Sequence, residues 1–404
     1  MRYTIGQLAE IIDGDRGKNY PKQDEFYPQG YCLFLNTGNV TKEGLTFKEN
    51  QFITKEKDEA LRKGKLKRGD IVYTTRGTVG NAGYYNSNVP YENVRINSGM
   101  VILRANGEIV DARFLYQILK SEYYRPYFKQ YCTGSAQPQL PIKNFSQIYL
   151  NVPDIKTQHR IADILSAYDD LIENNQRQIK LLEEAARRLY KEWFVDLNFP
   201  GHENTKIVDG VPEGWSKSTI FEVSAILRRG ISPKYNEKAR GIVINQKCIR
   251  QTIVSYDEAR TQEKKYPAEL EMMESDIVIC STGAGTLGRV GQIFEAKGNA
   301  TLDSHVTLIR ANEKIGQQSL FWSLKMKQDY LMNAGKGSTN QLELSRETIG
   351  SCEILMPERK IAEQVEKNFV AIHNKMKECS MQIARLREVR DLLLPKLMSG
   401  EMEV

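Results

Sequence analysis

The chain has 404 residues, of which 40% are hydrophobic and 27% are charged, and its formal net charge is +6. These values are typical of a soluble globular protein that is long enough for two or three domains. The sequence contains no stretch of about 18 apolar residues and no secretory leader, which argues against a membrane span or export. We therefore expect a cytoplasmic protein.

The positive charge lies mainly in the first part of the chain. Residues 1–152 carry 21 Lys and Arg against 15 Asp and Glu. Such weak basicity fits a subunit that shares the neutralisation of DNA phosphates with partners, and it also fits an ordinary cytosolic enzyme. The six cysteines form no CxxC pair, and the four histidines lie at no ligand spacing. We therefore expect reduced thiols and no metal site.

Residues 1–152 are predicted to form a first globule of mixed strands and helices. Residues 4–12 have helical apolar spacing and are followed by Gly14, a pattern that predicts a helix. Two apolar runs, 70–75 and 100–103, are bounded by Gly and Asn and predict strands. Residues 112–120 show the spacing of an amphipathic helix.

A long charged helix is predicted next, within residues 153–199. No Pro or Gly occurs between Asp154 and Trp193. Apolar residues recur there with a heptad period, on one line that includes Ile161 and on a neighbouring line that includes Ile164 and Leu171. About 40 residues at about 1.5 Å each make a rod of about 60 Å. Its apolar stripe is too broad to be buried without a partner.

The second half of the chain repeats this order, with a globule predicted at 200–356 and a helix at 357–404. The segment SGMVILRAN, which begins at Ser98, lies 206 positions before SHVTLIRAN, which begins at Ser304. The pair Gly134-Ser135 is answered by Gly337-Ser338. Pro153 and Pro357 open the two helices, 204 residues apart.

The repeats predict an α+β fold of two globules in a pseudo-twofold arrangement, separated by two long helices that form an antiparallel coiled coil. Polar Asn175 and Gln178 would set the register of that coil. Duplex DNA has dyads of the same kind, and half-site recognition is the usual reason for matching them. The alternative is a structural duplication whose two copies share no task. For the helices, the alternative is that they form a dimerisation stalk.

One motif is similar to a nucleotide site. Residues 283–288 satisfy GxGxxG and follow a predicted strand at 276–280. A dinucleotide site needs a helix next, whereas residues 289–294 predict another strand. No P-loop and no proline pair of the amino-methyltransferase kind occur. We interpret the loop as a turn between two strands, and the chain as one that recognises without reacting and has no catalytic residue.

Several short motifs occur in a specific order along nearly the whole chain. They are Asp70-Ile71-Val72 with the glycine loop 77–80, the segment 134–140, Trp193-Phe194-Val195-Asp196, Phe199-Pro200-Gly201-His202-Glu203, Val211-Pro212-Glu213-Gly214-Trp215, and the segment 394–401. Together they resemble the specificity subunit of a type I restriction–modification system.

The resemblance implies that residues 1–152 and 200–356 are two target-recognition domains, each of which reads one half of a split DNA sequence. The helices 153–199 and 357–404 would be conserved spacers that set the gap. Implied partners are double-stranded DNA, two methyltransferase subunits and restriction or translocase subunits, and no membrane. S-adenosylmethionine, ATP and Mg²⁺ would belong to those subunits, so this chain would hold no cofactor and would not be an enzyme.

Base reading requires Arg or Lys for guanine edges and phosphates, and Asn or Gln for adenine edges. On this basis we expect DNA contacts from Arg76, Arg95, Asn97, Gln137 and Lys143 in the first domain, and from Arg228, Arg229, Lys247, Arg250, Lys336 and Arg346 in the second. Arg104 and Arg310 recur at equivalent places, which favours a structural salt bridge. Two alternatives remain: a scaffold that binds only protein, and an enzyme that uses the loop 283–288 for a nucleotide.

Overall fold

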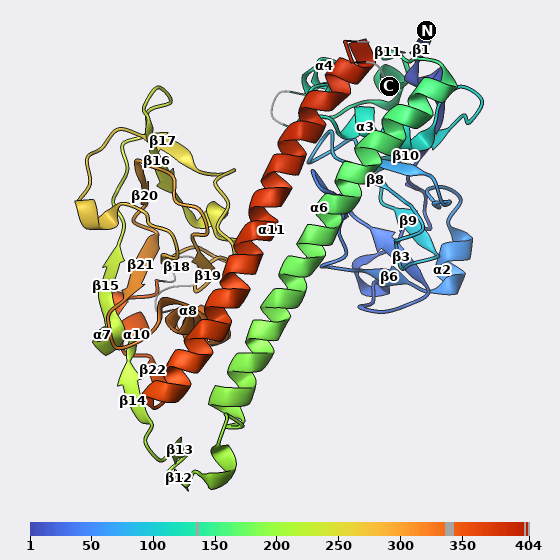
Figure 1. Cartoon of the computed structure of the whole chain (residues 1–404). Helices are drawn as coiled ribbons and strands as arrows, with labels where there is room; N and C mark the ends of the chain where they lie inside the picture. Colours follow the sequence, from blue (N-terminus) through green and yellow to red (C-terminus); the bar gives the residue numbers. More distant parts are fainter. Residues whose placement is uncertain (135–136, 336–342, 400, 403–404) are drawn as a thin grey trace. The chain divides into compact units, whose positions relative to one another are not determined.

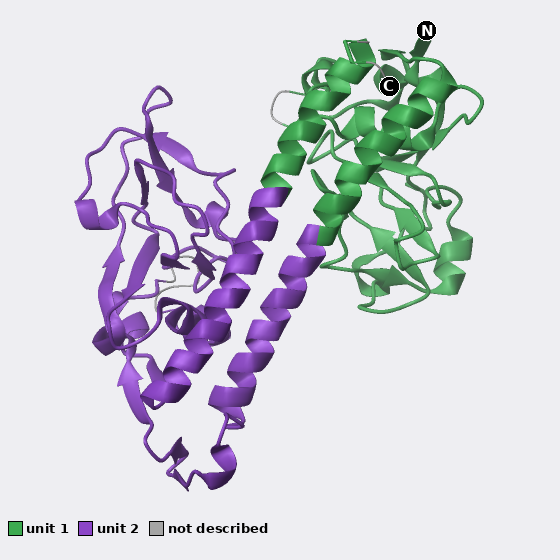
Figure 2. Ribbon diagram, viewed as in Figure 1, with its two compact units in different colours: residues 1–174, 383–404 green, residues 175–382 purple. Residues whose placement is uncertain are grey.

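The computed structural model describes residues 1–134, 137–335, 343–399 and 401–402 (Figure 1). The chain divides into two compact units, of which unit 1 comprises residues 1–174 and 383–404 and unit 2 comprises residues 175–382 (Figure 2). The division passes through both long helices, so each unit contains one globule and a part of each helix. The four domains predicted above are consecutive stretches of the sequence. The two units are instead defined by which residues lie in contact, so their boundaries differ from those of the predicted domains.

The globule of unit 1 is built on two small sheets. A four-stranded antiparallel sheet has the order β2-β10-β7-β8, and a three-stranded sheet has the order β6-β3-β9, in which β3 and β9 are parallel. The strands are β1 (Arg2–Thr4), β2 (Ala9–Asp13), β3 (Cys32–Leu35), β4 (Val40–Thr41), β5 (Gly44–Leu45), β6 (Phe52–Ile53), β7 (Ile71–Thr74), β8 (Ala82–Tyr84), β9 (Val94–Ile96), β10 (Met100–Ala105) and β11 (Tyr149–Asn151). The helices are α1 (Ile5–Leu8), α2 (Lys55–Ala60), α3 (Ala112–Lys120), α4 (Arg125–Lys129) and α5 (Ile142–Ser146).

The globule of unit 2 has the corresponding sheets. The four-stranded sheet has the order β15-β21-β18-β19, and the three-stranded sheet has the order β17-β16-β20, in which β16 and β20 are parallel. The strands are β12 (Ile207–Val208), β13 (Val211–Pro212), β14 (Ser216–Thr219), β15 (Ser224–Arg229), β16 (Gly241–Ile244), β17 (Arg260–Gln262), β18 (Ile277–Cys280), β19 (Val290–Gln292), β20 (Ala300–Leu302), β21 (Val306–Ala311) and β22 (Glu353–Met356). The helices are α7 (Ile220–Val223), α8 (Gln317–Met326), α9 (Gln328–Asn333) and α10 (Arg346–Gly350).

The two globules therefore share one topology. In unit 1, β1 pairs with β11, the last strand of the globule, and in unit 2, β14 pairs with β22 in the same way. A one-turn helix directly follows β1 and β14. The same α+β order then leads into a long helix. The duplication predicted from the repeats is thus confirmed, although the copies Ser135, Gly337 and Ser338 lie outside the described residues.

Both faces of each four-stranded sheet are buried, which explains the continuous apolar runs. In unit 1, Ile71 and Tyr73 of β7 pack with α3, whereas Val72 packs with the three-stranded sheet. In unit 2, the even and odd residues of β18 divide in the same way, with Ile277 and Ile279 in one core and Val278 and Cys280 in the other. Successive side chains of a strand point to opposite faces, so a strand between two cores shows no polar alternation.

The predicted strands at 70–75 and 100–103 and the predicted helix at 112–120 are confirmed as β7, β10 and α3. The predicted helix at residues 4–12 is wrong beyond its first turn. Helix α1 ends at Leu8, and Ala9 begins β2, which pairs with β10 from Ala9 to Asp13. A short helix is marginal without packing, and here the edge of the sheet captures the residues that would have continued it.

Each globule leads into a long helix that begins two residues after the predicted proline. The helices are α6 (Ile155–Tyr190), which continues as a π-helical turn, η3 (Lys191–Val195), and α11 (Arg359–Ser399). None of the helices among the described residues is both long enough and apolar enough to cross a membrane.

The two long helices pair in antiparallel fashion within each unit. In unit 1, Ile161 of α6 shares a core with Leu397 of α11, and further along Asp169 accepts a 2.9 Å hydrogen bond from Arg390. In unit 2, Gln178 lies 3.8 Å from the Cys379 sulfur. Residue numbers rise along α6 while they fall along α11, so the predicted antiparallel pairing is confirmed.

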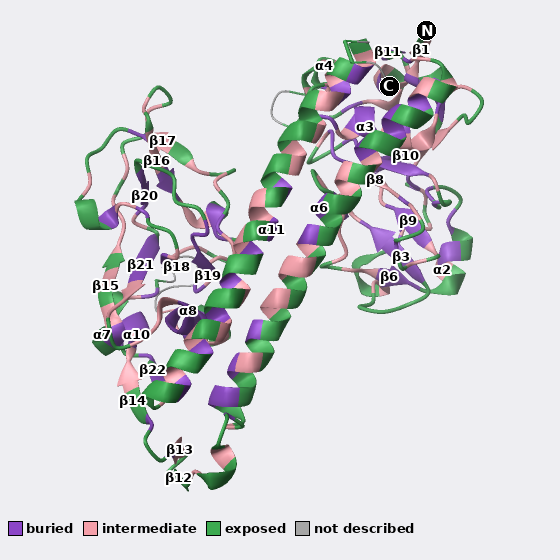
Figure 3. Cartoon of the chain, in the orientation of Figure 1, coloured by how far each residue is buried: buried purple, intermediate pink, exposed green. Residues whose placement is uncertain are grey.

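The stripe buried on α6 is narrower than the heptad pattern indicated. Ile161, Ile172 and polar Asn175 are buried, whereas Ile164 and Leu171 are 36% and 51% exposed. Figure 3 shows buried and exposed stretches following one another along α6. The partner helix covers one line of the stripe and leaves the neighbouring line at the surface.

A buried histidine connects α11 to the globule of unit 2. His373 Nδ1 lies 3.1 Å from Gln292 Oε1, and its Nε2 lies 3.5 Å from Ser275 Oγ. The ring also packs against Phe294, with 4.3 Å between ring centroids. Burial lowers the pKa of His373 from 6.5 to about 4, and the charges that face it are those of Glu274 and Lys377.

We expect the stability of unit 2 to fall in acid because of this histidine. The unfolded chain takes up a proton near pH 6.5, whereas folded His373 resists protonation until about pH 4. Protonation therefore favours the unfolded state, and the free energy of unfolding should drop by up to about 3 kcal/mol as the pH falls through this window. Urea titrations of the wild type and of His373→Gln from pH 7 to pH 4 measure this. Parallel pH dependences of the two proteins would contradict the prediction.

Candidate nucleic-acid interface

The glycine loop of unit 1 is held in a cluster of loops at the end of β7 and the start of β10. The backbone N–H groups of Thr75 and Arg76 donate to the Gly99 carbonyl oxygen, at 2.9 and 3.1 Å. Leu140 N donates to the Thr75 carbonyl at 2.9 Å, and Arg76 forms a β-bridge with Gln139. Main-chain bonds therefore bring the segments 75–77, 97–99 and 137–140 together.

Gly77 lets this cluster close because its backbone is left-handed, with a φ of 71°. Thr37 belongs to the same cluster, since a Cβ placed on Gly77 would lie 3.9 Å from Thr37 Oγ1. Thr37 begins the short 3₁₀ helix η2 (Thr37–Asn39), which is capped by Asn36 Oδ1 accepting from Gly38 N at 2.8 Å. The cluster thus collects loops from both sheets of the globule.

Unit 2 repeats the main bonds of this frame. Ser281 N donates to the His305 carbonyl at 2.8 Å, Leu344 N donates to the Ser281 carbonyl at 2.8 Å, and Thr282 forms a β-bridge with Glu343. The short helix η5 (Gln246–Cys248) likewise has an asparagine cap, because Asn245 Oδ1 accepts from the N–H of Lys247 at 2.8 Å.

The shared frame identifies equivalent positions whose side chains differ. They are Arg76 and Thr282, Gly99 and His305, Gln139 and Glu343, and Thr37 and Gln246. Because backbone atoms make the frame, these side chains are free to change without altering it. Two loop clusters of one shape thus carry two different sets of hydrogen-bonding groups.

The structure brings part of the predicted set of unit 1 together. Arg76 and Gln137 are exposed in the cluster, and Asn97 is half-buried with its Oδ1 accepting from Gly99 N at 2.9 Å. Among the described residues none forms a hydrogen bond or an ion pair with the Arg76 guanidinium. Lys143 is exposed on α5, where no such bond joins it to the described cluster.

Arg95 does not lie at the surface, contrary to the prediction that it contacts DNA. It is 5% exposed, and its Nε donates to the buried carboxylate of Asp58 at 2.5 Å. Its two Nη atoms donate to the carbonyls of Lys63, Asp58 and Leu61 at 2.7 to 3.0 Å. Four hydrogen bonds therefore hold the guanidinium inside the globule. The sequence shows Arg95 in the loop region of the repeat, but β9 turns its side chain inward.

In unit 2, some of the predicted arginines form ion pairs with glutamates of the same chain. Arg228 forms an ion pair with Glu269, and Arg229 reaches into the cluster, where it pairs with Glu343 at 2.6 Å. Lys247 is exposed beside Gln246, and Arg250 Nε donates to the Lys247 carbonyl at 3.1 Å.

Two predicted residues of unit 2 are not placed in the cluster. Arg346 is exposed on α10, with its guanidinium 5.9 Å from the centre of the Phe221 ring. Lys336 lies outside the described residues. Of the basic residues predicted in unit 2, the structure thus places Arg229 in the cluster and Lys247 beside it on η5.

Sequence reasoning missed Gln246, Thr282 and His305. A signal for one of them was present, because His305 occupies the position of Gly99 in the two SGMV and SHVT segments. A side chain that appears in only one copy of a repeated loop is a candidate for the property in which the copies differ.

Arg104 and Arg310 form the structural salt bridges that their recurrence indicated. Arg104 Nε and Nη2 donate to Asp70 at 3.0 and 2.8 Å, and Arg310 makes the same fork to Asp276 at 2.6 and 2.8 Å. Both aspartates are 2% exposed at the side chain. The bidentate geometry orients each arginine toward the globule.

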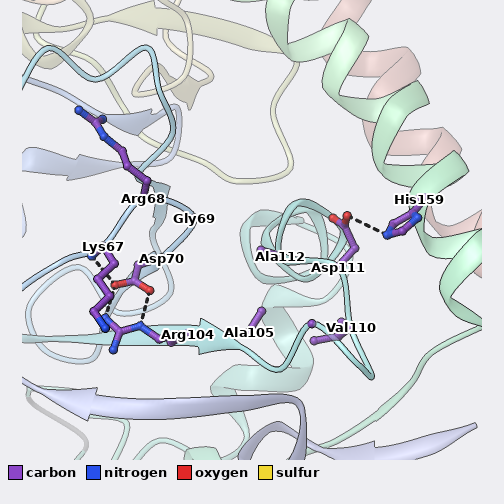
Figure 4. A pocket seen from close by; sticks show the side chains of 11 residues that line it. Lys67, Arg68, Gly69, Asp70, Arg104, Ala105, Val110, Asp111, Ala112 and His159 are labelled. Carbon is purple, nitrogen blue, oxygen red and sulfur yellow. Dashed lines mark hydrogen bonds and ion pairs between the residues drawn. The ribbon is translucent and has the colours of Figure 1, made fainter.

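A shallow hollow of about 360 Å³ beside one of these bridges offers no separate chemistry (Figure 4). Its lining includes the Asp70 and Arg104 pair and a second pair, in which Asp111 lies 3.4 Å from His159 of α6. Each carboxylate thus has a neighbouring basic group. The hollow lies between the globule of unit 1 and α6, and the pair of Asp111 and His159 links the two.

The loop 283–288 is a turn, as we interpreted it. It connects β18 to β19, which pair in antiparallel register, and its glycines at 283, 285 and 288 have positive φ. A dinucleotide site needs a helix N-terminus at this point, whereas the strand β19 follows this loop. Among the described residues no group of three His, Cys, Asp or Glu side chains could hold a metal ion.

Comparisons with known proteins agree on one family. The model of the family described as type I restriction modification DNA specificity domain matches residues 1–184. The HindI specificity subunit of Haemophilus influenzae is 26% identical over 98% of this chain and 100% of its own length. The MjaIX specificity subunit of Methanocaldococcus jannaschii is 25% identical over 83% of this chain and 78% of its own length. A solved S subunit from M. genitalium shares the fold, with a TM-score of 0.57 and 17% identity over 98% of this chain and 95% of its own.

Proposed function

Since the chain belongs to the family of type I restriction–modification specificity subunits, we propose that it recognises a bipartite DNA sequence, with one loop cluster for each half. The observation that carries this proposal is the pair of clusters with one backbone frame and different outward side chains. A protein that reads two different short sequences needs a constant scaffold and variable hydrogen-bonding groups at its tips.

We assign no chemical step to this chain. The relatives are named for specificity, and the one loop that was similar to a nucleotide site is a turn between strands. Methyl transfer from S-adenosylmethionine, and cleavage or translocation driven by ATP and Mg²⁺, would belong to partner subunits. An adenine that is to be methylated must leave the duplex, and that pocket is expected in the methyltransferase.

The long helices are the proposed docking surface for two methyltransferase subunits and for restriction or translocase subunits. On α6 the exposed apolar residues include Ile164 and Leu171, which lie one heptad apart. On α11 they include Val389 and Leu392, which are 41% and 59% exposed. Large apolar side chains grouped on an exposed helix commonly mark a protein contact. The 36 residues of α6 also make a rod of about 54 Å that would set the spacing of the half-sites.

We further propose that the protein acts in the cytoplasm. The six cysteines are free thiols, as expected in a reducing compartment. Burial raises the pKa of Cys280 to about 12, which makes that thiol unreactive.

A methylation map tests the proposed function directly. The chain would be co-expressed with the methyltransferase encoded beside it, and N6-methyladenine would be mapped by long-read sequencing. We expect a split motif, with two short specific blocks around a fixed gap. Methylation of a continuous motif that persists when this chain is deleted would overturn the proposal and favour a scaffold that binds only protein.

Arg76→Ala should relax one base pair in the half-site read by unit 1. The guanidinium is exposed in the cluster without a partner among the described residues, and a bidentate Arg contact to a guanine contributes about 1–3 kcal/mol of discrimination. Lys55→Ala is a suitable control, since Lys55 is a 58% exposed cation on α2 of the same globule. Methylation maps of both variants measure the effect. If Arg76→Ala and Lys55→Ala leave the same motif, Arg76 does not read a base.

A further inference from the structure

Three side chains in the loop cluster of unit 2 form a hydrogen-bonded series. Gln246 Nε2 donates to the carbonyl oxygen of Thr282 at 2.8 Å and to its Oγ1 at 2.9 Å. Thr282 Oγ1 lies 2.7 Å from Nδ1 of His305. The series runs from the half-buried 3₁₀ helix η5 outward to His305, whose side chain is exposed.

The direction of the protons in this series follows from what each group can do. A carbonyl oxygen only accepts, so it fixes the amide of Gln246 with Nε2 toward Thr282. Thr282 Oγ1 then accepts from Gln246 and keeps one hydrogen to donate. Among the described residues, the acceptor within reach of that hydrogen is His305 Nδ1. With Thr282 as the donor to Nδ1, the ring hydrogen of His305 lies on Nε2.

The main chain at His305 is equally well anchored. Its N–H donates to the carboxylate of Asp303 at 2.9 Å, and its carbonyl accepts from Ser281 N at 2.8 Å. With Nδ1 bound to Thr282, the Nε2–H on the opposite side of the ring is directed away from the series. In unit 1 the equivalent position is Gly99, which has no side chain. The oriented donor is therefore a feature of unit 2 alone.

We propose that His305 is a specificity-determining residue of unit 2, which donates its Nε2–H to an acceptor on the major-groove edge of a base. This inference rests on the proposed function. Guanine, adenine and thymine offer an acceptor in the major groove, whereas cytosine offers only a donor. His305 therefore selects against cytosine at the base that it contacts. Thr282 and Gln246 are positioning residues that set the tautomer.

A base edge suits this group better than a phosphate does. Phosphate contacts gain from positive charge, because each neutralised phosphate releases counterions. The hydrogen bond from Thr282 occupies Nδ1 of His305 and leaves one ring hydrogen, on Nε2, that points in one direction. Exposed Lys247, which directly follows Gln246 in η5, is better suited to a phosphate. A donor held in one direction distinguishes bases, whereas a mobile cation does not.

Two substitutions at position 305 separate the outward donor from the bond to Thr282. The amide of His305→Gln falls near the place of Nε2 and retains an outward donor. The shorter amide of His305→Asn falls near the place of Nδ1, so it retains the bond to Thr282 and loses the outward donor. Each variant of the full chain would be co-expressed with the methyltransferase, and its N6-methyladenine motif mapped.

We expect His305→Asn to admit cytosine at one position of the half-site of unit 2, with discrimination there reduced about tenfold. His305→Gln should keep the wild-type motif, and Thr282→Val should relax the same single position as His305→Asn. The half-site of unit 1 stays unchanged in all three variants and reports that the chain folds and assembles.

Four other outcomes would contradict the inference or the proposed function. If the wild type has a split motif and His305→Asn leaves it intact, His305 reads no base. If His305→Gln relaxes the motif and His305→Asn does not, the bond to Thr282 is structural and the inference is wrong. A uniform loss of methylation without a change of motif would also overturn it, in favour of a phosphate contact. Absence of any split motif in the wild type would instead reject the proposed function.

Discussion

Replacing Trp322 with alanine is expected to destabilise unit 2 by about 3–5 kcal/mol, the usual cost of removing a large buried aromatic side chain. Trp322 lies on α8 and is 2% exposed. Its ring stacks on Phe369 of α11, with 6.1 Å between centroids, and meets Phe321 edge-on at 5.1 Å. The substitution would open a cavity between the globule of unit 2 and helix α11.

Hydrogen exchange measured by mass spectrometry can locate this effect in the chain. Faster exchange should appear in β18, β21 and the part of α11 in unit 2, whereas β7 and β10 of unit 1 should be unchanged. Tyr330→Ala is the matched control, because Tyr330 on the adjacent helix α9 is 59% exposed and its loss should change stability by less than about 0.5 kcal/mol. Equal exchange in the two variants would mean that Trp322 does not hold this core together.

Replacing Arg310 with alanine should be nearly as damaging, at about 3–5 kcal/mol, because it leaves a buried carboxylate without its cation. Asp276 is 2% exposed at the side chain and receives both hydrogen bonds of the Arg310 fork. Arg310 also donates to the carbonyls of Glu269 and Glu271 at 3.0 and 2.6 Å. These four bonds join β21 to the loop that precedes β18.

The equivalent bridge in unit 1 provides an internal comparison. Arg104 is more exposed than Arg310, at 28% against 15% of its side chain, so Arg104→Ala should cost less than Arg310→Ala. Urea unfolding of both variants measures the difference. Arg310→Lys should recover only part of the loss, since an ammonium keeps the charge but not the fork. If Arg310→Ala were as stable as the wild type and changed only the DNA motif, its role would be base reading instead of structure.

The division of the sequence into two copies predicted most of the fold. The 206-residue spacing of the SGMV and SHVT segments located β10 and β21, and the prolines located the starts of α6 and α11. These features are local: a strand between two cores must be apolar at every position, and a long helix requires a chain free of Pro and Gly. Helix α1 shows the limit, because pairing with β10 decides where it ends.

The candidate site was predicted less completely than the fold. Arg76 was predicted because it lies in a glycine loop that the repeat marks, and the structure leaves it exposed. Arg95 belongs to the same region of the sequence, but it is buried against Asp58, 37 residues away along the chain. Basic residues near a loop have the same composition whether they face solvent or an internal carboxylate. The group that pairs with each charged side chain could therefore be identified only from the structure.

Residue order alone predicted the duplication, the long paired helices, the resemblance to specificity subunits and the structural salt bridges of Arg104 and Arg310, because periodicity and repetition are properties of the sequence. Which side chains meet at the loop clusters became known only from the three-dimensional structure. Thr282 and His305 are separated by 23 residues, and Gln246 and Thr282 by 36, yet they share one hydrogen-bonded series. Such a series depends on backbone pairing between distant strands, which brings together groups whose spacing along the chain carries no periodic signal.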